Sequence, residues 1–174
     1  MSDVPEPGHA AAAPGGPLPS ISADALGAEL ARSVRVRAER RPRGVAEFAG
    51  AYSLDPDRVH AELTFLSIVT MQFCIGAGLP DHPRQRDVGV AYYAALWAGE
   101  PWRVDQAGLA ARIGHYETAL NNPDPSLGRA YGVGRAFARQ CGASHDVAVI
   151  EFGARAYVEQ LAPILDLLRG VAVT

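Results

Sequence analysis

The sequence contains no lysine, so all 16 of its basic residues are arginines. Schiff-base catalysis, covalent binding of pyridoxal phosphate and phosphate binding by a P-loop all require a lysine amine. The absence of lysine therefore excludes these three chemistries for this chain. We attribute it to coding bias in a GC-rich genome and expect a bacterial protein.

Cysteine is also scarce. The two cysteines, Cys74 and Cys141, lie in apolar stretches, where buried free thiols are usual. Two isolated cysteines provide neither a metal-binding motif nor a disulfide framework. The N-terminal residues lack the basic segment and the sustained apolar core of a secretory signal. We therefore expect a cytoplasmic protein without a metal ion or another cofactor.

The chain has 174 residues, of which 48% are hydrophobic, and a formal net charge of −3. This length and composition are typical of a single soluble globular domain that needs no disulfide or metal for stability. Residues 1–20 contain five prolines and three glycines, a composition that cannot form a packed element. We predict a disordered tail over residues 1–20 and one domain over residues 21–174.

One long apolar run dominates the sequence, from Val59 to Leu79. Its uncharged part, Leu63–Leu79, has 17 residues and is at the lower limit for crossing a bilayer. Polar residues interrupt it, no second run of similar length exists, and neither a Trp/Tyr belt nor a cluster of basic residues flanks it. We therefore predict the central buried helix of a bundle rather than a membrane span.

Apolar residues recur at helical spacing along most of the domain. Glycine, proline and capping residues divide this pattern into helices over residues 23–41, 45–52, 57–75, 81–97, 102–120, 126–141 and 145–168, the second being short. No stretch has the alternating pattern of a strand, and short connections favour antiparallel neighbours. The sequence predicts an all-α fold, an orthogonal or up-down helical bundle of about six helices with a buried central helix.

Glu62 is a carboxylate on an apolar face of the central helix. It must be either protonated or paired with an arginine. Two interpretations remain open. In the first, Glu62 is stabilised by the helix N-terminus and by Arg58 one turn earlier. In the second, it belongs to a polar pocket within the bundle. The candidate pocket residues are Glu62, His60, His115 and Tyr116.

The two histidines of this set also form His-x-Glu pairs, with Glu62 and with Glu117. Residues two apart on a helix point about 200° apart, so neither pair can chelate one ion. None of the predicted helices contains a Glu-x-x-His or a His-Glu-x-x-His motif. We therefore predict no metal site.

A basic run precedes the central helix. The candidate basic face consists of Arg32, Arg35, Arg40, Arg41 and Arg43, with Arg37 in the same run. A nucleic-acid interface would also need aromatic or amide side chains that read bases, or a helix-turn-helix, and neither is evident. Basic residues near a helix C-terminus are favoured by the helix dipole. The sequence therefore disfavours nucleic-acid binding.

Three features distinguish the last two helices. Glu151, Arg155 and Glu159 are spaced for a ladder of ion pairs along the final helix. A second apolar strip on the same helix leads us to expect a homodimer, the commonest symmetric oligomer. The candidate dimer face consists of Val149, Phe152 and Ala156. In the preceding helix, Gly128, Gly132 and Gly134 predict a close approach of two helices, because glycine lets backbones come near each other.

No motif specifies an activity, so three functions remain open. The first is a homodimeric protein-interaction, scaffold or regulatory module, a non-enzymatic role that the lack of catalytic motifs favours. The second is a small-molecule-binding protein or enzyme with a pocket between helices near Glu62. The third is nucleic-acid contact through the basic helix at Arg32–Arg43.

Overall fold

The computed structural model describes residues 18–40, 42–80, 82–98, 106–123 and 125–174, and within them the chain forms seven helices and two short strands. The helices are α1 (Ala23–Glu39), α2 (Val45–Ala51), α3 (Pro56–Gly78), α4 (Gln85–Trp97), α5 (Gln106–Asn121), α6 (Gly128–Gln140) and α7 (Val147–Arg169), and the strands are β1 (Ser20–Ile21) and β2 (Ala172–Val173). The predicted all-α fold is confirmed. Residues 1–17 of the predicted tail lie outside the described residues.

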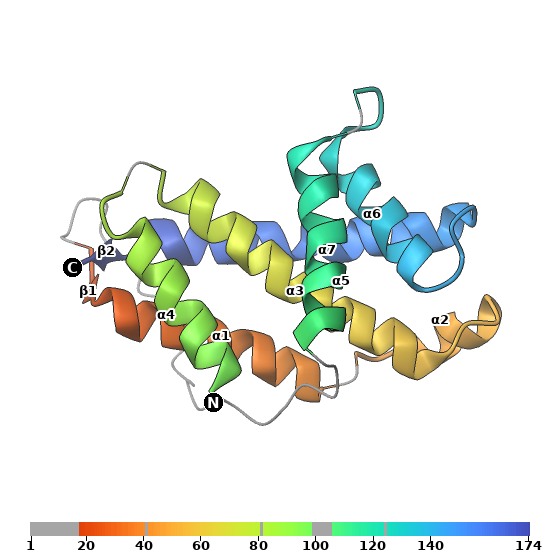
Figure 1. The fold of residues 1–174 in the computed structure, drawn as a ribbon, viewed down its shortest axis with the longest axis horizontal. Helices are drawn as coiled ribbons and strands as arrows, with labels where there is room; N and C mark the ends of the chain where they lie inside the picture. The colour runs from red at the N-terminus through yellow and green to blue at the C-terminus, as the bar shows by residue number, and fades with distance from the viewer. Residues whose placement is uncertain (1–17, 41, 81, 99–105, 124) are drawn as a thin grey trace, which may run out of the picture.

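The helix α3 is the central helix that the sequence predicts, and it contacts all six other helices (Figure 1). Asp55 caps it by accepting a hydrogen bond from the backbone N–H of Asp57 at 2.9 Å, and Pro56 occupies its first turn. The helix ends at Gly78, three residues beyond the predicted end. Among the described segments it alone is long and apolar enough to cross a membrane, and 56% of that apolar window is buried against the rest of the fold.

Two helix pairs flank α3, α1 with α4 and α6 with α7 (Figure 1). Glycine lies at both crossings. A Cβ on Gly27 of α1 would lie 2.6 Å from the backbone N of Tyr92 in α4, and one on Gly134 of α6 would lie 2.2 Å from the carbonyl O of Ile150 in α7. Carbon atoms do not approach other atoms this closely, so both crossings depend on the missing side chain. The predicted close approach is confirmed at Gly134, but not at Gly132 or Gly128, where a Cβ would meet no described atom closer than 3.6 Å.

The two strands are a feature that the sequence analysis missed. They pair in parallel, Ser20 with Ala172 and Ile21 with Val173, and the N–H of Thr174 donates to the carbonyl O of Ile21 at 3.0 Å. The pairing joins the residues before α1 to the residues after α7. A strand of two residues has no alternating pattern, so its sequence carries no strand signal.

Candidate functional site: an arginine-rimmed groove

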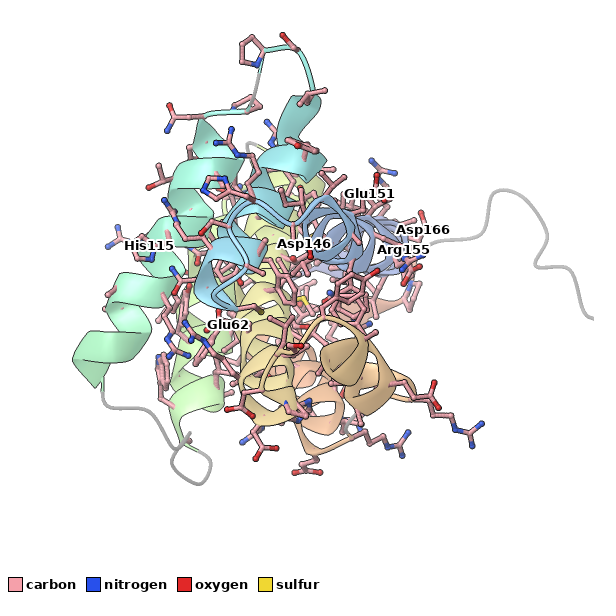
Figure 2. All side chains as sticks on the ribbon, turned by 90° about the vertical axis from the view of Figure 1, so that its right-hand side faces the viewer. Glu62, His115, Asp146, Glu151, Arg155 and Asp166 are labelled. Atoms are coloured by element: carbon pink, nitrogen blue, oxygen red, sulfur yellow. The ribbon has the colours of Figure 1, made fainter. Side chains whose placement is uncertain are left out.

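The structure separates the four residues of the predicted pocket into three places. Glu62 and Tyr116 meet in the interior, where the Tyr116 hydroxyl donates to Glu62 Oε2 at 3.1 Å. His60 faces the C-terminal end of α1, with its Nε2 2.8 Å from the carbonyl O of Ala38. His115 lies on the outer side of α5, well away from Glu62 (Figure 2). A single pocket containing all four residues is therefore wrong, because the crossing of α3 and α5 turns Tyr116 towards Glu62 and leaves His115 exposed.

Glu62 has no exposed surface and lies 2.8 Å, through Oε1, from Nη1 of Arg112 in α5. The guanidinium also covers the ring of Phe65, 5.0 Å from its centroid. The N–H bonds of Arg112 do not point straight at Oε1, which forms an ion pair there but no hydrogen bond. These contacts hold α5 against α3. They confirm that the Glu62 carboxylate is paired with an arginine.

Burial dominates the electrostatics of this cluster. Desolvation raises the pKa of Glu62, while the charges of Arg112 and Arg58 and the hydrogen bond from Tyr116 partly offset the rise. Desolvation likewise raises the pKa of the Cys141 thiol to about 12, so this cysteine stays protonated and unreactive at neutral pH. A dissolved substrate cannot reach Glu62 while it is enclosed in this way. We therefore interpret the cluster as structural.

A different site lies between the C-terminal end of α1, α3 and α7. Here the surface is hollowed into a groove of about 530 Å³, which we call the α1–α7 groove. Arginines from three segments form its rim, namely Arg37, Arg40, Arg43 and Arg155. Apolar side chains form much of its floor, namely Val36, Val45, Leu63, Phe152 and Ala156. Pockets of about 300–1,000 Å³ with an apolar lining and a few polar groups are typical of small-molecule sites.

None of the four rim arginines forms an ion pair within the described part of the chain. The ladder predicted on α7 is therefore wrong, because Arg155 lies beyond ion-pair distance of Glu151 and Glu159. Glu159 is the one carboxylate among the described lining residues of the groove. The groove thus carries four guanidinium charges against one carboxylate in a chain whose net charge is −3.

Two buried polar atoms of the lining have no hydrogen-bond partner within the described residues. Because a carbonyl oxygen only accepts, the contact with Ala38 places the proton of a neutral His60 ring on Nε2, and Nδ1 becomes an acceptor. This Nδ1 is buried and has no hydrogen bond. Gln160 is similar, since its Nε2 donates to the carbonyl O of Ala156 at 2.7 Å while its buried Oε1 is unpartnered. Both atoms suit a ligand that donates hydrogen bonds.

The basic run predicted as one face is divided. Arg32 is paired with Glu29, with Nη2 2.5 Å from Oε1, while Arg40 and Arg43 belong to the rim of the α1–α7 groove. Arg35 is half-buried on α1, and Arg41 lies outside the described residues. Among its described members, the run is therefore divided between the Arg32–Glu29 ion pair and the rim of the α1–α7 groove.

The three residues of the predicted dimer face do not form one exposed surface. Val149 is fully buried inside the chain, so it is unavailable to a partner and that part of the prediction is wrong. Phe152 stacks on Phe48 of α2, with ring centroids 3.9 Å apart, and lies with Ala156 in the α1–α7 groove. The homodimer itself stays a prediction.

The sequence analysis missed two members of the groove, Arg155 and Gln160. Both lie on α7, more than 100 residues after the basic run, and no local pattern relates them to it.

In the described part of the chain, no three His, Cys, Asp or Glu side chains are grouped to hold a metal ion. Comparison of the chain with protein-family models, with curated proteins and with solved structures found no match.

Proposed function

We propose that the protein binds a small organic anion with an apolar body in the α1–α7 groove. The observation that carries this proposal is the set of four arginines, without an ion pair in the described part of the chain, that lines a largely apolar hollow of about 530 Å³. Guanidinium groups form strong, often bidentate, hydrogen bonds with carboxylates and phosphates. A ligand with one such group at the rim and an apolar part on the floor satisfies both kinds of lining.

The unpartnered acceptors refine the class of ligand. His60 Nδ1 and Gln160 Oε1 each require a donor, and a buried polar atom without a partner is costly. An anion that also carries a hydroxyl, amine or amide would supply that donor. Among the three functions that the sequence leaves open, this geometry supports small-molecule binding. The groove lies along a face of α3 that includes His60 and Leu63 but not Glu62.

The first test compares two dyes that differ by one charge. Anilinonaphthalene sulfonate carries an apolar ring system and an anionic group, whereas phenylnaphthylamine has the same rings without the sulfonate. We expect the anionic dye to bind with one molecule per chain and the neutral dye at least about tenfold more weakly, because the rim guanidiniums attract only the former. Dye fluorescence during titration measures both affinities.

Two kinds of variant locate the bound dye. We expect Arg43→Gln and Arg155→Gln each to weaken binding of the anionic dye about three- to tenfold, and the exposed Arg86→Gln on α4 to leave it unchanged. Ala156→Leu should fill the floor and weaken both dyes, whereas Ala162→Leu, exposed on the same helix, should not. Equal affinities for all these variants would contradict the proposal.

A further inference from the structure

A second groove of about 530 Å³ lies on another part of the molecule, between α5, α6 and the loop that joins α6 to α7. We call it the α5–α6 groove. We infer that it binds a small hydrophilic polyanion of the phosphate-ester or pyrophosphate class. The inference goes beyond the proposed function and does not depend on it, because the two grooves share no lining residue among those described.

The charge of the α5–α6 groove is of one sign. Arg135 and Arg139 line it from α6, His115 lines it from α5 and His145 from the loop, and no carboxylate is among its described lining residues. Neither arginine forms an ion pair within the described part of the chain. The carboxylate of Asp146, which follows His145 in the sequence, caps α7 by accepting hydrogen bonds from the N–H groups of Ala148 and Val149 and is not paired with either arginine.

The spacing of the two arginines suits more than one anionic group. Residues four apart on a helix have Cβ atoms about 5–6 Å apart on the same face. Two guanidiniums one turn apart can therefore each grip an oxygen-rich group of the same ligand. Arginine forks match the oxygens of phosphate in geometry as well as in charge.

The His115 ring is oriented to donate. Its Nδ1 lies 2.5 Å from Nε2 of Gln140 in α6, and an amide NH₂ only donates. The proton of the neutral ring therefore lies on Nε2, which becomes a donor. The hydroxyls of Thr118 and Ser144 line the same groove. Together these groups offer an anion hydrogen bonds in addition to charge.

The apolar residues that line this groove are smaller than those of the α1–α7 groove. Its remaining described residues include Ala119, Gly132 and Ala136, which are small and provide no large apolar floor. The α1–α7 groove, by contrast, contains Phe152 and Leu63. Figure 2 shows His115 and Arg155 on opposite sides of the molecule, so one small ligand cannot reach both grooves.

Titration with inorganic pyrophosphate tests this inference. We expect calorimetry to show one pyrophosphate bound per chain with a Kd below about 1 mM. Arg135→Gln and Arg139→Gln should each weaken binding about tenfold, and the double variant should abolish it. Both arginines are exposed, so these variants should keep the melting temperature of the unliganded protein. In NMR spectra, pyrophosphate should shift the ring signals of His115 and His145.

Two control variants separate this site from the first. Arg86→Gln and Arg43→Gln should both bind pyrophosphate as the unaltered protein does, and pyrophosphate should not displace anilinonaphthalene sulfonate. If Arg43→Gln weakens pyrophosphate binding while Arg135→Gln does not, the anion occupies the α1–α7 groove and the inference is overturned. It is also overturned if no saturable binding occurs up to about 10 mM, ten times the Kd of a weak complex. Neither outcome affects the dye experiment, which tests the proposed function separately.

Discussion

Replacing Gly134 with alanine is expected to destabilise the protein by about 3 kcal/mol, the upper part of the range for overpacking a core. The new Cβ would lie 2.2 Å from the carbonyl O of Ile150 and 3.0 Å from the backbone N and the Cβ of Ala154. Backbone atoms inside α7 cannot move aside alone, so α6 would have to move away from α7. That movement would also loosen Phe137, whose ring packs where a Cβ on Gly153 would lie.

The matched control is Gly132→Ala, two residues earlier in the same helix. Its Cβ would meet only the carbonyl O of Ala119, at an ordinary contact distance of 3.6 Å. Alanine is favoured over glycine in a helix interior by up to about 1 kcal/mol, so this variant should be neutral or more stable. Urea unfolding followed by circular dichroism measures both free energies. Equal free energies of unfolding for the two variants would refute the close crossing of α6 and α7.

Replacing Arg112 with methionine is expected to cause the second large loss of stability. It removes the charge that faces Glu62 and leaves a fully buried carboxylate held only by Tyr116 among its described contacts. Breaking a fully buried ion pair costs about 3–5 kcal/mol, but the Arg112 side chain is 32% exposed and partly screened. We therefore expect a loss of about 2 kcal/mol at neutral pH. In this variant, a further Glu62→Gln change should recover most of it.

The loss should depend on pH in a defined direction. The pKa of Glu62 is raised above its ordinary value of 4.5 in the folded state, because burial outweighs the opposing charges, and removing Arg112 raises it further. The folded state then holds the proton more tightly than the unfolded state, so stability falls as pH rises from 4.5 through the folded-state pKa. On acidification towards pH 4.5, Arg112→Met should regain stability relative to the unaltered protein.

Free energies of unfolding measured between acid and neutral pH test this dependence. Arg86→Met, an exposed arginine outside the cluster, should differ little from the unaltered protein at any pH. The double variant with Glu62→Gln should lack the additional pH dependence, because it has no carboxylate at that position. A constant loss across the pH range would show that Arg112 stabilises the fold by packing on Phe65 and not through the charge of Glu62.

The helices were predictable because their signals are local. Asp55 and Pro56 mark the start of α3, and Gly142 follows α6 with a left-handed φ of 85°, as a helix-ending glycine does. The apolar run beginning at Val59 identified the buried centre, since a helix that is apolar on all sides needs neighbours on all sides. Such signals depend on residues within a few positions of each other.

The sites were less predictable because they combine distant segments. The sequence indicated that Glu62, on an apolar face, is either protonated or paired with an arginine, yet its partner Arg112 lies 50 residues later and on another helix. The histidines His60 and His115 share a motif with a glutamate, but their helices turn them to different sides of the molecule. Spacing in the sequence therefore indicated that Glu62 requires a proton or an ion-pair partner, but it did not identify Arg112 as that partner.

The sequence by itself determined that this chain has no lysine chemistry, that it is all-α, and that α3 is its buried centre. The tertiary structure decided where charge gathers. The packing of α7 brings Arg155 to the arginines at the C-terminal end of α1 and in the loop after it. The packing of α5 against α6 places His115 in one groove with Arg135 and Arg139. The physical reason is that helix crossings are set by the shapes of side chains across an interface. Gly27 and Gly134 bring two of these crossings close, and this proximity cannot be derived from either helix alone.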